Sequence, residues 1–125
     1  MKVLAGRLRF VFEGLEEISK KELPFKLSYT LAKLHRKIVA ELEPFEEARL
    51  RLLQKHAKRG ADGRFISNPE KDGYLLENVE EFTKEYLPIA SEEVEIDFPP
   101  IKASMFDGLS VAPEVLFKLS DFIEE

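Results

Sequence analysis

The sequence predicts a mainly helical α+β fold for a single domain that spans residues 1–125. A long kinked helix is expected in an antiparallel helical hairpin or bundle, with a small β element beside it. Three observations predict this fold. Apolar residues recur at three- and four-residue steps in four segments. The stretch from Glu92 to Phe98 alternates acidic and apolar residues after its first residue, as a half-buried strand does. The chain has 125 residues, of which 44% are hydrophobic, which is enough for one core.

The first segments of the chain predict a short strand and a helix. The strand is expected over residues 1–3. An amphipathic helix is expected over residues 6–21, and Pro24 separates it from the next helix because the residue before a proline is driven out of the helical region. The apolar stripe of this first helix is formed by Leu4, Leu8, Val11, Phe12, Leu15 and Ile18.

The second helix carries the strongest pattern in the chain and is expected over residues 25–58. Gly60 follows it as a C-terminal cap. Pro44 removes one backbone hydrogen bond from this helix, so a kink is expected near residues 41–43. The apolar stripe stays in phase across the proline, which favours one kinked helix over two separate helices. The stripe is formed by Leu27, Leu31, Leu34, Ile38, Leu42, Phe45, Ala48, Leu52 and His56.

The C-terminal half predicts shorter elements. A turn-rich stretch flanked by Phe65-Ile66 and Tyr74-Leu75-Leu76 predicts a small hairpin. Asn78, with Glu81 three residues later, predicts the start of a helix, and Pro113 fits the first position of the last one. The remaining elements are a helix over residues 78–90, a strand over 92–98 with an acidic outer face, and a helix over 113–123.

The net charge of −5 conceals an asymmetry between the two halves. Residues 1–64 carry 15 Lys and Arg against 9 Asp and Glu, a balance of +6. Residues 65–125 carry 4 against 15, a balance of −11. Either a basic arm and an acidic tail are exposed to partners, or the halves pack together and neutralise each other. Apolar periodicity in both halves favours the second interpretation. Scarce amide and sulfur residues beside abundant Glu, Lys and Arg favour a heat-tolerant source.

The residue inventory argues against enzyme chemistry, so we expect no enzyme, no cofactor and no metal. The chain has no cysteine. His35 and His56 lie 21 residues apart on one predicted helix, about 30 Å by helix rise, too far to share a metal ion. The six glycines form no phosphate-binding cluster, and the paired glutamates lie on charged surfaces.

Two charged clusters are the candidate interaction residues. A basic cluster near the end of the long helix could bind phosphates, although interleaved glutamates favour a solvated flank of a coiled coil. An acidic cluster on the predicted strand is expected to face a cationic partner, either Arg51 and Lys55 of the same chain or another protein. The basic cluster is Arg51, Lys55, Lys58 and Arg59, and the acidic cluster is Glu93, Glu95 and Asp97.

Several runs resemble a family of small hypothetical proteins from tailed bacteriophages and prophages. These runs are Leu-Pro-Phe-Lys-Leu-Ser-Tyr-Thr-Leu-Ala-Lys-Leu from Leu23, Phe-Glu-Glu-Ala-Arg-Leu-Arg-Leu from Phe45, Asn78-Val-Glu-Glu-Phe, Glu93-Val-Glu-Ile-Asp, and the terminal segment from Pro113. Together they cover most of the chain in the same order. The family has no established activity, so the resemblance implies a phage-related context and supplies no catalytic residues.

We therefore expect a non-enzymatic phage or prophage accessory protein, a virion structural or assembly component that acts through protein–protein contacts. One alternative is an inhibitor or regulator of a host protein, bound through the acidic second half. The other alternative is nucleic-acid binding through the basic long helix. The long helix carries more apolar stripe than short helices can cover, which favours a coiled-coil homo-oligomer. No membrane-spanning run or signal-peptide core is visible, so we expect a soluble protein in the host cytoplasm or the virion.

Overall fold

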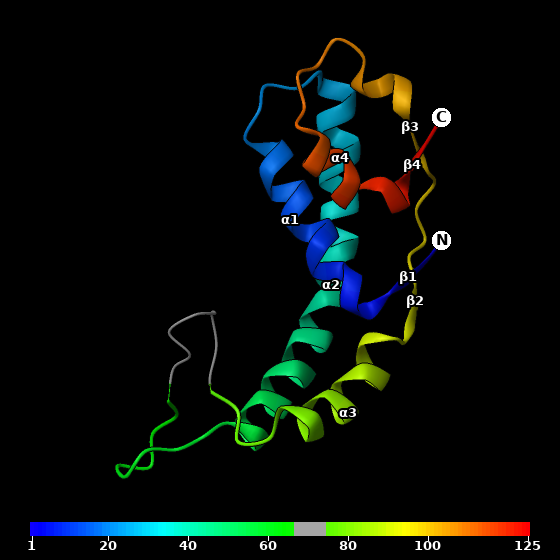
Figure 1. The fold of residues 1–125 in the computed structure, drawn as a ribbon. Coiled ribbons are helices and arrows are strands. Elements are labelled where there is room, and N and C mark those ends of the chain that lie inside the picture. Colours follow the sequence, from blue (N-terminus) through cyan, green and yellow to red (C-terminus); the bar gives the residue numbers. More distant parts are fainter. Residues whose placement is uncertain (67–74) are drawn as a thin grey trace.

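A computed structural model describes residues 1–66 and 75–125 of the chain. The predicted fold class is confirmed: the described part is mainly helical, with two small two-stranded sheets (Figure 1). The helices are α1 (Leu8–Ser19), α2 (Phe25–His56), α3 (Val79–Ala90) and α4 (Pro113–Lys118). The strands are β1 (Lys2–Leu4), β2 (Glu93–Glu95), β3 (Ile101–Lys102) and β4 (Ile123–Glu124).

Helices α1 and α2 form an antiparallel hairpin, as expected (Figure 1). The first helix begins later than predicted, because a 3-10 turn over Ala5–Arg7 precedes it, and it ends at Ser19. Its predicted stripe is buried except at two positions: Leu4 is exposed on β1, and Phe12 is half-buried. The buried side of α1 faces α2 and α4, so the hairpin supplies most of the core.

Helix α2 continues without a break through Pro44 and changes direction in its second half (Figure 1). A proline inside a helix removes one N–H donor and crowds the preceding turn, so a bend is the expected response. The stripe is buried from Leu27 to Phe45, and its last members, Ala48, Leu52 and His56, are half-buried. This end of α2 is less buried because α1 does not extend along it. Helix α3 packs there instead (Figure 1).

The helix predicted to reach residue 58 ends at His56, because the chain beyond it is extended. The Lys58 N–H donates to the Leu75 carbonyl at 2.7 Å, and the Ile66 N–H donates to the Lys58 carbonyl at 3.0 Å. Gly63, with a φ of 78°, lies in the turn that brings Arg59 opposite Phe65, and its N–H donates to the Gly60 carbonyl at 2.9 Å. Tyr74 of the predicted hairpin, and the turns predicted at Asn68-Pro69 and Asp72-Gly73, lie outside the described residues.

Helix α3 runs back along the second half of α2 (Figure 1). Its predicted cap is confirmed, since the Asn78 side chain accepts a hydrogen bond from the Glu81 N–H at 3.2 Å. None of its residues is fully buried, and Val79 is 62% exposed. Helix α3 is therefore the most loosely covered of the three long helices.

Strand β2 lies where the alternating sequence predicts a strand, and it pairs antiparallel with β1 so that Val3 lies opposite Val94. Ile96 and Phe98 are buried and the three acidic side chains are exposed, so the predicted alternation is confirmed. The paired strand is shorter than expected because β1 reaches only to Glu95. One further bond runs from the Ile96 N–H to the Met1 carbonyl at 2.8 Å.

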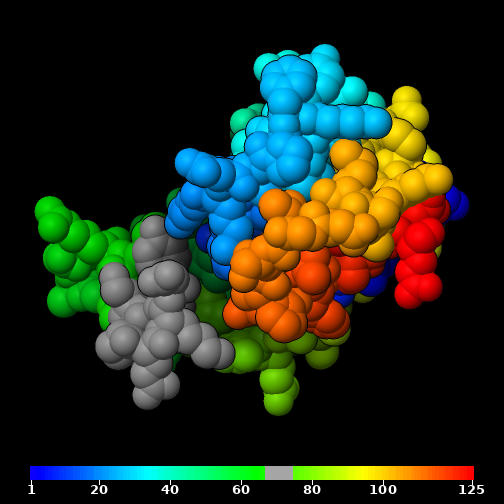
Figure 2. All heavy atoms as spheres, turned by 90° about the horizontal axis from the view of Figure 1, so that it is seen from above, coloured from blue at the N-terminus to red at the C-terminus, as the bar shows by residue number. Residues whose placement is uncertain are grey.

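The prediction of one helix over residues 113–123 is wrong. Helix α4 ends at Lys118, and a 3-10 turn over Ser120–Phe122 leads into β4. Strand β4 pairs in parallel with β3, so Ile123 must be extended to reach Ile101. Figure 2 shows these last residues, in red, beside the yellow segment that holds β3. Leu116 of the predicted apolar face is 36% exposed.

Candidate protein-interaction surface

The structure does not gather the seven predicted interaction residues into one site. The basic residues lie on the last turns of α2 and just beyond it, and the acidic residues lie on β2 and just beyond it (Figure 1). All seven side chains are exposed. Most of them are already engaged within the chain.

Two members of the basic cluster have partners of their own. The Lys55 ammonium lies 2.9 Å from the Glu85 carboxylate of α3, and Nε2 of His56 lies 3.1 Å from the other oxygen of the same carboxylate. The Arg59 guanidinium lies 4.7 Å from the centre of the Phe65 ring. Arg51 makes no ion pair in residues 1–66 and 75–125. Within the basic cluster, Lys55 therefore joins α2 to α3, and Arg59 packs on an aromatic ring.

The contact between α2 and α3 also lowers the pKa of the Glu85 carboxyl. The hydrogen bond from Lys55 and then that from His56 hold the pKa of the Glu85 carboxyl below its ordinary value of 4.5. Aromatic rings pack beside this group, with Phe82 edge-on to His56 at 6.2 Å and stacked on Tyr86 at 5.5 Å. The arrangement is a structural clamp between two helices.

The predicted contact between the acidic strand and Arg51 or Lys55 is wrong. The Met1 ammonium lies 2.9 Å from the Glu95 carboxylate, and Lys2 lies 3.7 Å from Glu93. The pairing of β1 with β2 brings the first residues of the chain to this face. The hydrogen bond from the Met1 ammonium lowers the pKa of the Glu95 carboxyl. At Asp97 it is the backbone carbonyl that accepts a hydrogen bond, from the Lys37 ammonium.

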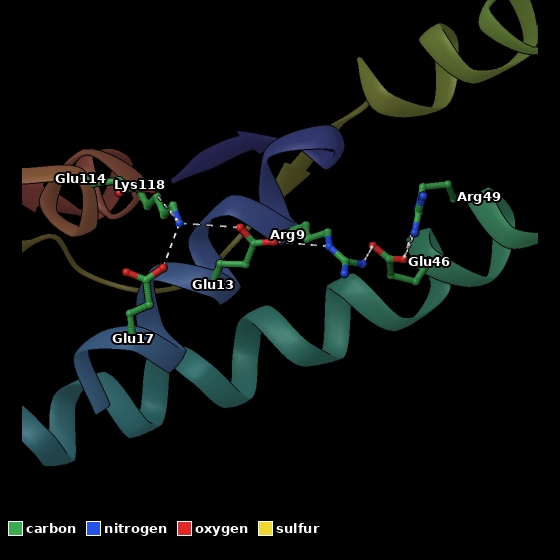
Figure 3. A network of polar contacts seen from close by, with 7 residues as sticks. All are labelled: Arg9, Glu13, Glu17, Glu46, Arg49, Glu114 and Lys118. Atoms are coloured by element: carbon green, nitrogen blue, oxygen red, sulfur yellow. Dashed lines mark hydrogen bonds and ion pairs between the residues drawn. The ribbon is translucent and has the colours of Figure 1, made fainter. Parts of the chain in front are cut away.

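A polar network that the sequence did not predict joins α1, α2 and α4 (Figure 3). The Lys118 ammonium, with only 9% of its side chain exposed, lies 3.0 Å from Glu17, 3.4 Å from Glu114 and 3.7 Å from Glu13. The hydrogen bond to Glu17 raises the pKa of the Lys118 ammonium. Of these partners, only Glu114 is close in sequence, at the four-residue step typical of a helical ion pair.

The same network continues along α1 to α2 through Arg9 (Figure 3). The Arg9 guanidinium lies 3.5 Å from Glu13 and 3.3 Å from Oε1 of Glu46, and Arg49 lies 3.0 Å from the other Glu46 oxygen. Oε1 of Glu46 is buried and accepts no hydrogen bond, so its contact with Arg9 is an ion pair only. Each charge faces an opposite charge, which indicates a structural role for the network.

One face of α2 is left uncovered by α1 and α3. Its residues recur at three-, four- and seven-residue steps opposite the buried stripe, and all of them are exposed. At one end, the Phe25 and Tyr29 rings stack at 6.0 Å with 83% and 57% of each residue exposed, and Lys33 lies 4.6 Å from the centre of the Tyr29 ring. We call this surface the open face of α2, and its residues are Phe25, Tyr29, Ala32, Arg36, Ala40, Glu43, Glu47 and Leu50.

Two hollows border the open face along the seam between α1 and α2. The first has a volume of about 300 Å³ and is lined by Ala32, His35 and Arg36, among others. The second has a volume of about 480 Å³, with an apolar floor and an acidic rim. Its lining consists of Phe12, Val39, Leu42, Glu43, Glu46, Glu47, Arg49 and Leu50.

Charge along α2 is divided into three blocks. Residues 23–40 contain four Lys and Arg residues and no acid, residues 41–47 contain four Glu and no base, and residues 48–59 contain five Lys and Arg residues and no acid. Sequence reasoning noted the charges but missed the open face. The signal was available in Phe25 and Tyr29, two aromatic residues at a four-residue spacing off the apolar stripe.

No family model matches the chain, and neither the curated proteins nor the solved structures contain a match. Within residues 1–66 and 75–125, no group of three or more His, Cys, Asp and Glu residues could hold a metal ion. Over the same residues, no helix combines the length and the hydropathy that crossing a bilayer requires. The open face of α2, with its exposed aromatic pair at Phe25 and Tyr29, is the candidate functional surface.

Proposed function

We propose that the protein is a non-enzymatic module that acts through protein–protein contacts, and that the open face of α2 makes those contacts. The observation that carries this proposal is the exposure of large apolar side chains at both ends of one helix face, with Phe25 at 83% and Tyr29 at 57% at one end and Leu50 at 46% at the other. Ordinary solvated helix faces are polar, and large apolar side chains exposed beside polar residues on one face are typical of an interaction surface.

The biological context of the proposal is a tailed phage or prophage, where the chain would serve as a virion or assembly component. The support for this context is the sequence resemblance of the runs from Leu23 and Phe45 to small phage proteins. The alternative of a host-protein regulator bound through the acidic second half has less support, because Glu93 and Glu95 have partners in the first two residues of the chain.

Purified virions test this function. Particles are isolated by density gradient from a lysate of the strain that carries the gene, and the chain is measured in them by mass spectrometry. We expect the wild-type chain in the particles and a loss of it in the Tyr29→Asp variant. Leu87→Asp, at a residue that is 54% exposed on α3, is the matched control and should remain in the particles. A wild-type chain found only outside the particles would contradict the virion role.

One observation favours nucleic-acid binding as a second candidate. The stacked rings of Phe25 and Tyr29 lie among cations, and exposed aromatic rings beside a basic strip are the usual platform for single-stranded bases. A labelled single-stranded oligonucleotide, followed by fluorescence anisotropy, would then bind with an affinity that falls steeply with salt. Phe25→Ala would weaken binding, and Glu43→Arg would strengthen it by adding a cation. Absence of binding at low salt excludes this candidate.

A further inference from the structure

We infer that the partner of the open face of α2 is a second copy of this chain, docked antiparallel about a two-fold axis that passes between Val39 and Ala40. This inference rests on the proposed function and names the partner of the same surface. In such an interface the same residues face each other from both copies, so the surface must be complementary to itself. Three features of α2 meet this requirement.

The first feature is the order of charges. Arg36 and Glu43 are both exposed, lie the same number of residues from the point between Val39 and Ala40, and make no ion pair in residues 1–66 and 75–125. An antiparallel two-fold therefore places Arg36 of each copy opposite Glu43 of the other. The same operation lays residues 32–38, which carry three Lys and Arg residues and no acid, toward the base-free residues 41–47 of the second copy. Residues 23–31, whose only charge is Lys26, lie toward the basic residues 48–56.

The second feature is the placement of apolar groups. Tyr29 and Leu50 lie the same number of residues from this point, Tyr29 in the aromatic pair and Leu50 on the lining of the 480 Å³ hollow. The two-fold brings the Tyr29 ring of one copy to the Leu50 edge of this hollow in the other, with the Phe25 ring stacked on it one turn farther along. Apolar rings on one part of a surface and an apolar hollow on another are the matched halves of a self-complementary contact.

The third feature is the size of the central side chains. Ala32 and Ala40 are small and exposed, and Val39 is half-buried, so two α2 helices can approach closely at the axis. A parallel arrangement is disfavoured by repulsion between like charges, because it places Arg36 beside Arg36 and Glu43 beside Glu43. Helix α1 flanks α2 on one side only, so the pair would form a row of four helices, α1–α2–α2–α1, with α3 beside the second half of each α2.

Single cysteines test the direction of docking, because the chain has no cysteine of its own. Ala40→Cys lies beside the axis and should form a disulfide-linked dimer on mild oxidation. Ala32→Cys, the matched control on the same face, would lie roughly 22 Å along the helix from its copy, far beyond disulfide reach. Cross-linking of Ala40→Cys alone is the expected result, read on non-reducing gels. Cross-linking of both variants would show parallel docking, and cross-linking of neither would show that α2 does not self-associate; either result overturns the inference.

Charge exchange tests the register. Sedimentation equilibrium of the purified chain should show a monomer–dimer equilibrium, and Arg36→Glu or Glu43→Arg should each raise the dimer Kd about tenfold, because the pair occurs twice in the dimer. The double variant Arg36→Glu/Glu43→Arg should return the Kd to within about threefold of wild type. Lys84→Glu, on α3 with 74% of its side chain exposed, is the control and should leave the Kd unchanged. Circular dichroism confirms that each variant is folded.

The outcomes separate this inference from the proposed function. A wild-type chain that stays monomeric at every concentration, yet enters virions in a Tyr29-dependent way, overturns the second copy as partner and keeps the interaction module. A dimer that follows the charge exchange but is absent from virions supports the second copy and contradicts the virion role. Tighter oligonucleotide binding by Glu43→Arg in a chain that never dimerises overturns the inference in favour of the nucleic-acid candidate.

Discussion

Leu34 lies on α2 with no solvent exposure, on the core side of the helix. Leu34→Asp places a carboxylate in an apolar environment with no partner, so we expect the free energy of unfolding to fall by about 4 kcal/mol or more. Urea unfolding followed by circular dichroism measures the loss. Leu87→Asp, at a site that is 54% exposed, is the control and should cost no more than about 1 kcal/mol. Equal losses for the two variants would contradict the assignment of the buried face.

Gly14 marks the closest approach of α1 and α4. A Cβ atom at this position would lie 2.9 Å from Cβ of Lys118 and 3.1 Å from Cδ2 of Leu119, closer than side chains pack. Gly14→Val should therefore force α4 away from α1 and lower the free energy of unfolding by about 2 kcal/mol. Thermal unfolding checks this expectation. An unchanged Tm would contradict this prediction. It would mean that α4 can shift with no loss of free energy of unfolding, so that the close contact at Gly14 does not contribute to stability.

The sequence predicted the buried residues correctly wherever the helical spacing was regular, as at Leu31 and Leu34. The partners of charged residues could not be predicted. Lys118 contacts Glu17, which lies 101 positions earlier in the chain, and nothing local in the sequence distinguishes that glutamate from its neighbours. Ion pairs between distant segments depend on how the helices pack together, and this packing could not be predicted from the sequence alone.

At the scale of elements, α2 and α3 are joined by Glu85, which faces Lys55 and His56. Its pKa is lowered in the folded chain, so its contribution to stability is present above about pH 4.5 and declines as the pH falls through the lowered value. The wild type should therefore lose stability toward acid more steeply than Glu85→Gln. Denaturant unfolding at a series of pH values from neutral to acid measures both slopes.

The control for this prediction is Glu80→Gln, the same change at an exposed residue of α3 that makes no ion pair with the described residues. Its acid slope should match that of the wild type. A wild-type slope equal to that of Glu85→Gln would show that the clamp between α2 and α3 makes no contribution to stability.

Elements with long periodic patterns were predictable, and elements defined by distant pairing were not. Helix α2 was expected because its stripe recurs over many turns, and the bend was expected because Pro44 interrupts it. The end of α4 was missed because the helical spacing of Leu119 and Phe122 continues past Lys118, while the backbone turns to pair with β3. Strand β3 was missed for the same reason, since two residues carry no periodicity of their own.

At the scale of the whole molecule, the helices differ in how much of their surface is buried by neighbouring elements. The first half of α2 is buried against α1, whereas α3 contains no fully buried residue. We expect amide hydrogens of Val79–Ala90 to exchange at least about tenfold faster than those of Leu27–Leu42, because local opening of α3 exposes little apolar surface. Hydrogen–deuterium exchange with mass spectrometry measures both segments. Equal protection would contradict this difference in local stability.

The predicted packing of the basic half against the acidic half agrees with ion pairs that cross between them. Arg7 lies 2.8 Å from Asp121, and Lys55 lies 2.9 Å from Glu85. The open face of α2 could not be predicted in the same way. An exposed face is whatever the neighbouring elements leave uncovered, and the positions of α1 and α3 around α2 were not fixed by the pattern of α2 itself.

Both ends of the chain are held by one short segment, residues 93–102, and this has a consequence during synthesis. Val3 pairs with Val94, which is synthesised 91 residues later. Strand β1 therefore leaves the ribosome long before its partner strand has been made. The α1–α2 hairpin needs only nearby residues and can form at once. In that interval the first strand exposes unpaired N–H and C=O groups beside a nascent core. Strand β2 then pairs with β1, and β4 (Ile123–Glu124) pairs with β3 in the same segment, so both sheets can form only after the helical hairpin has been synthesised.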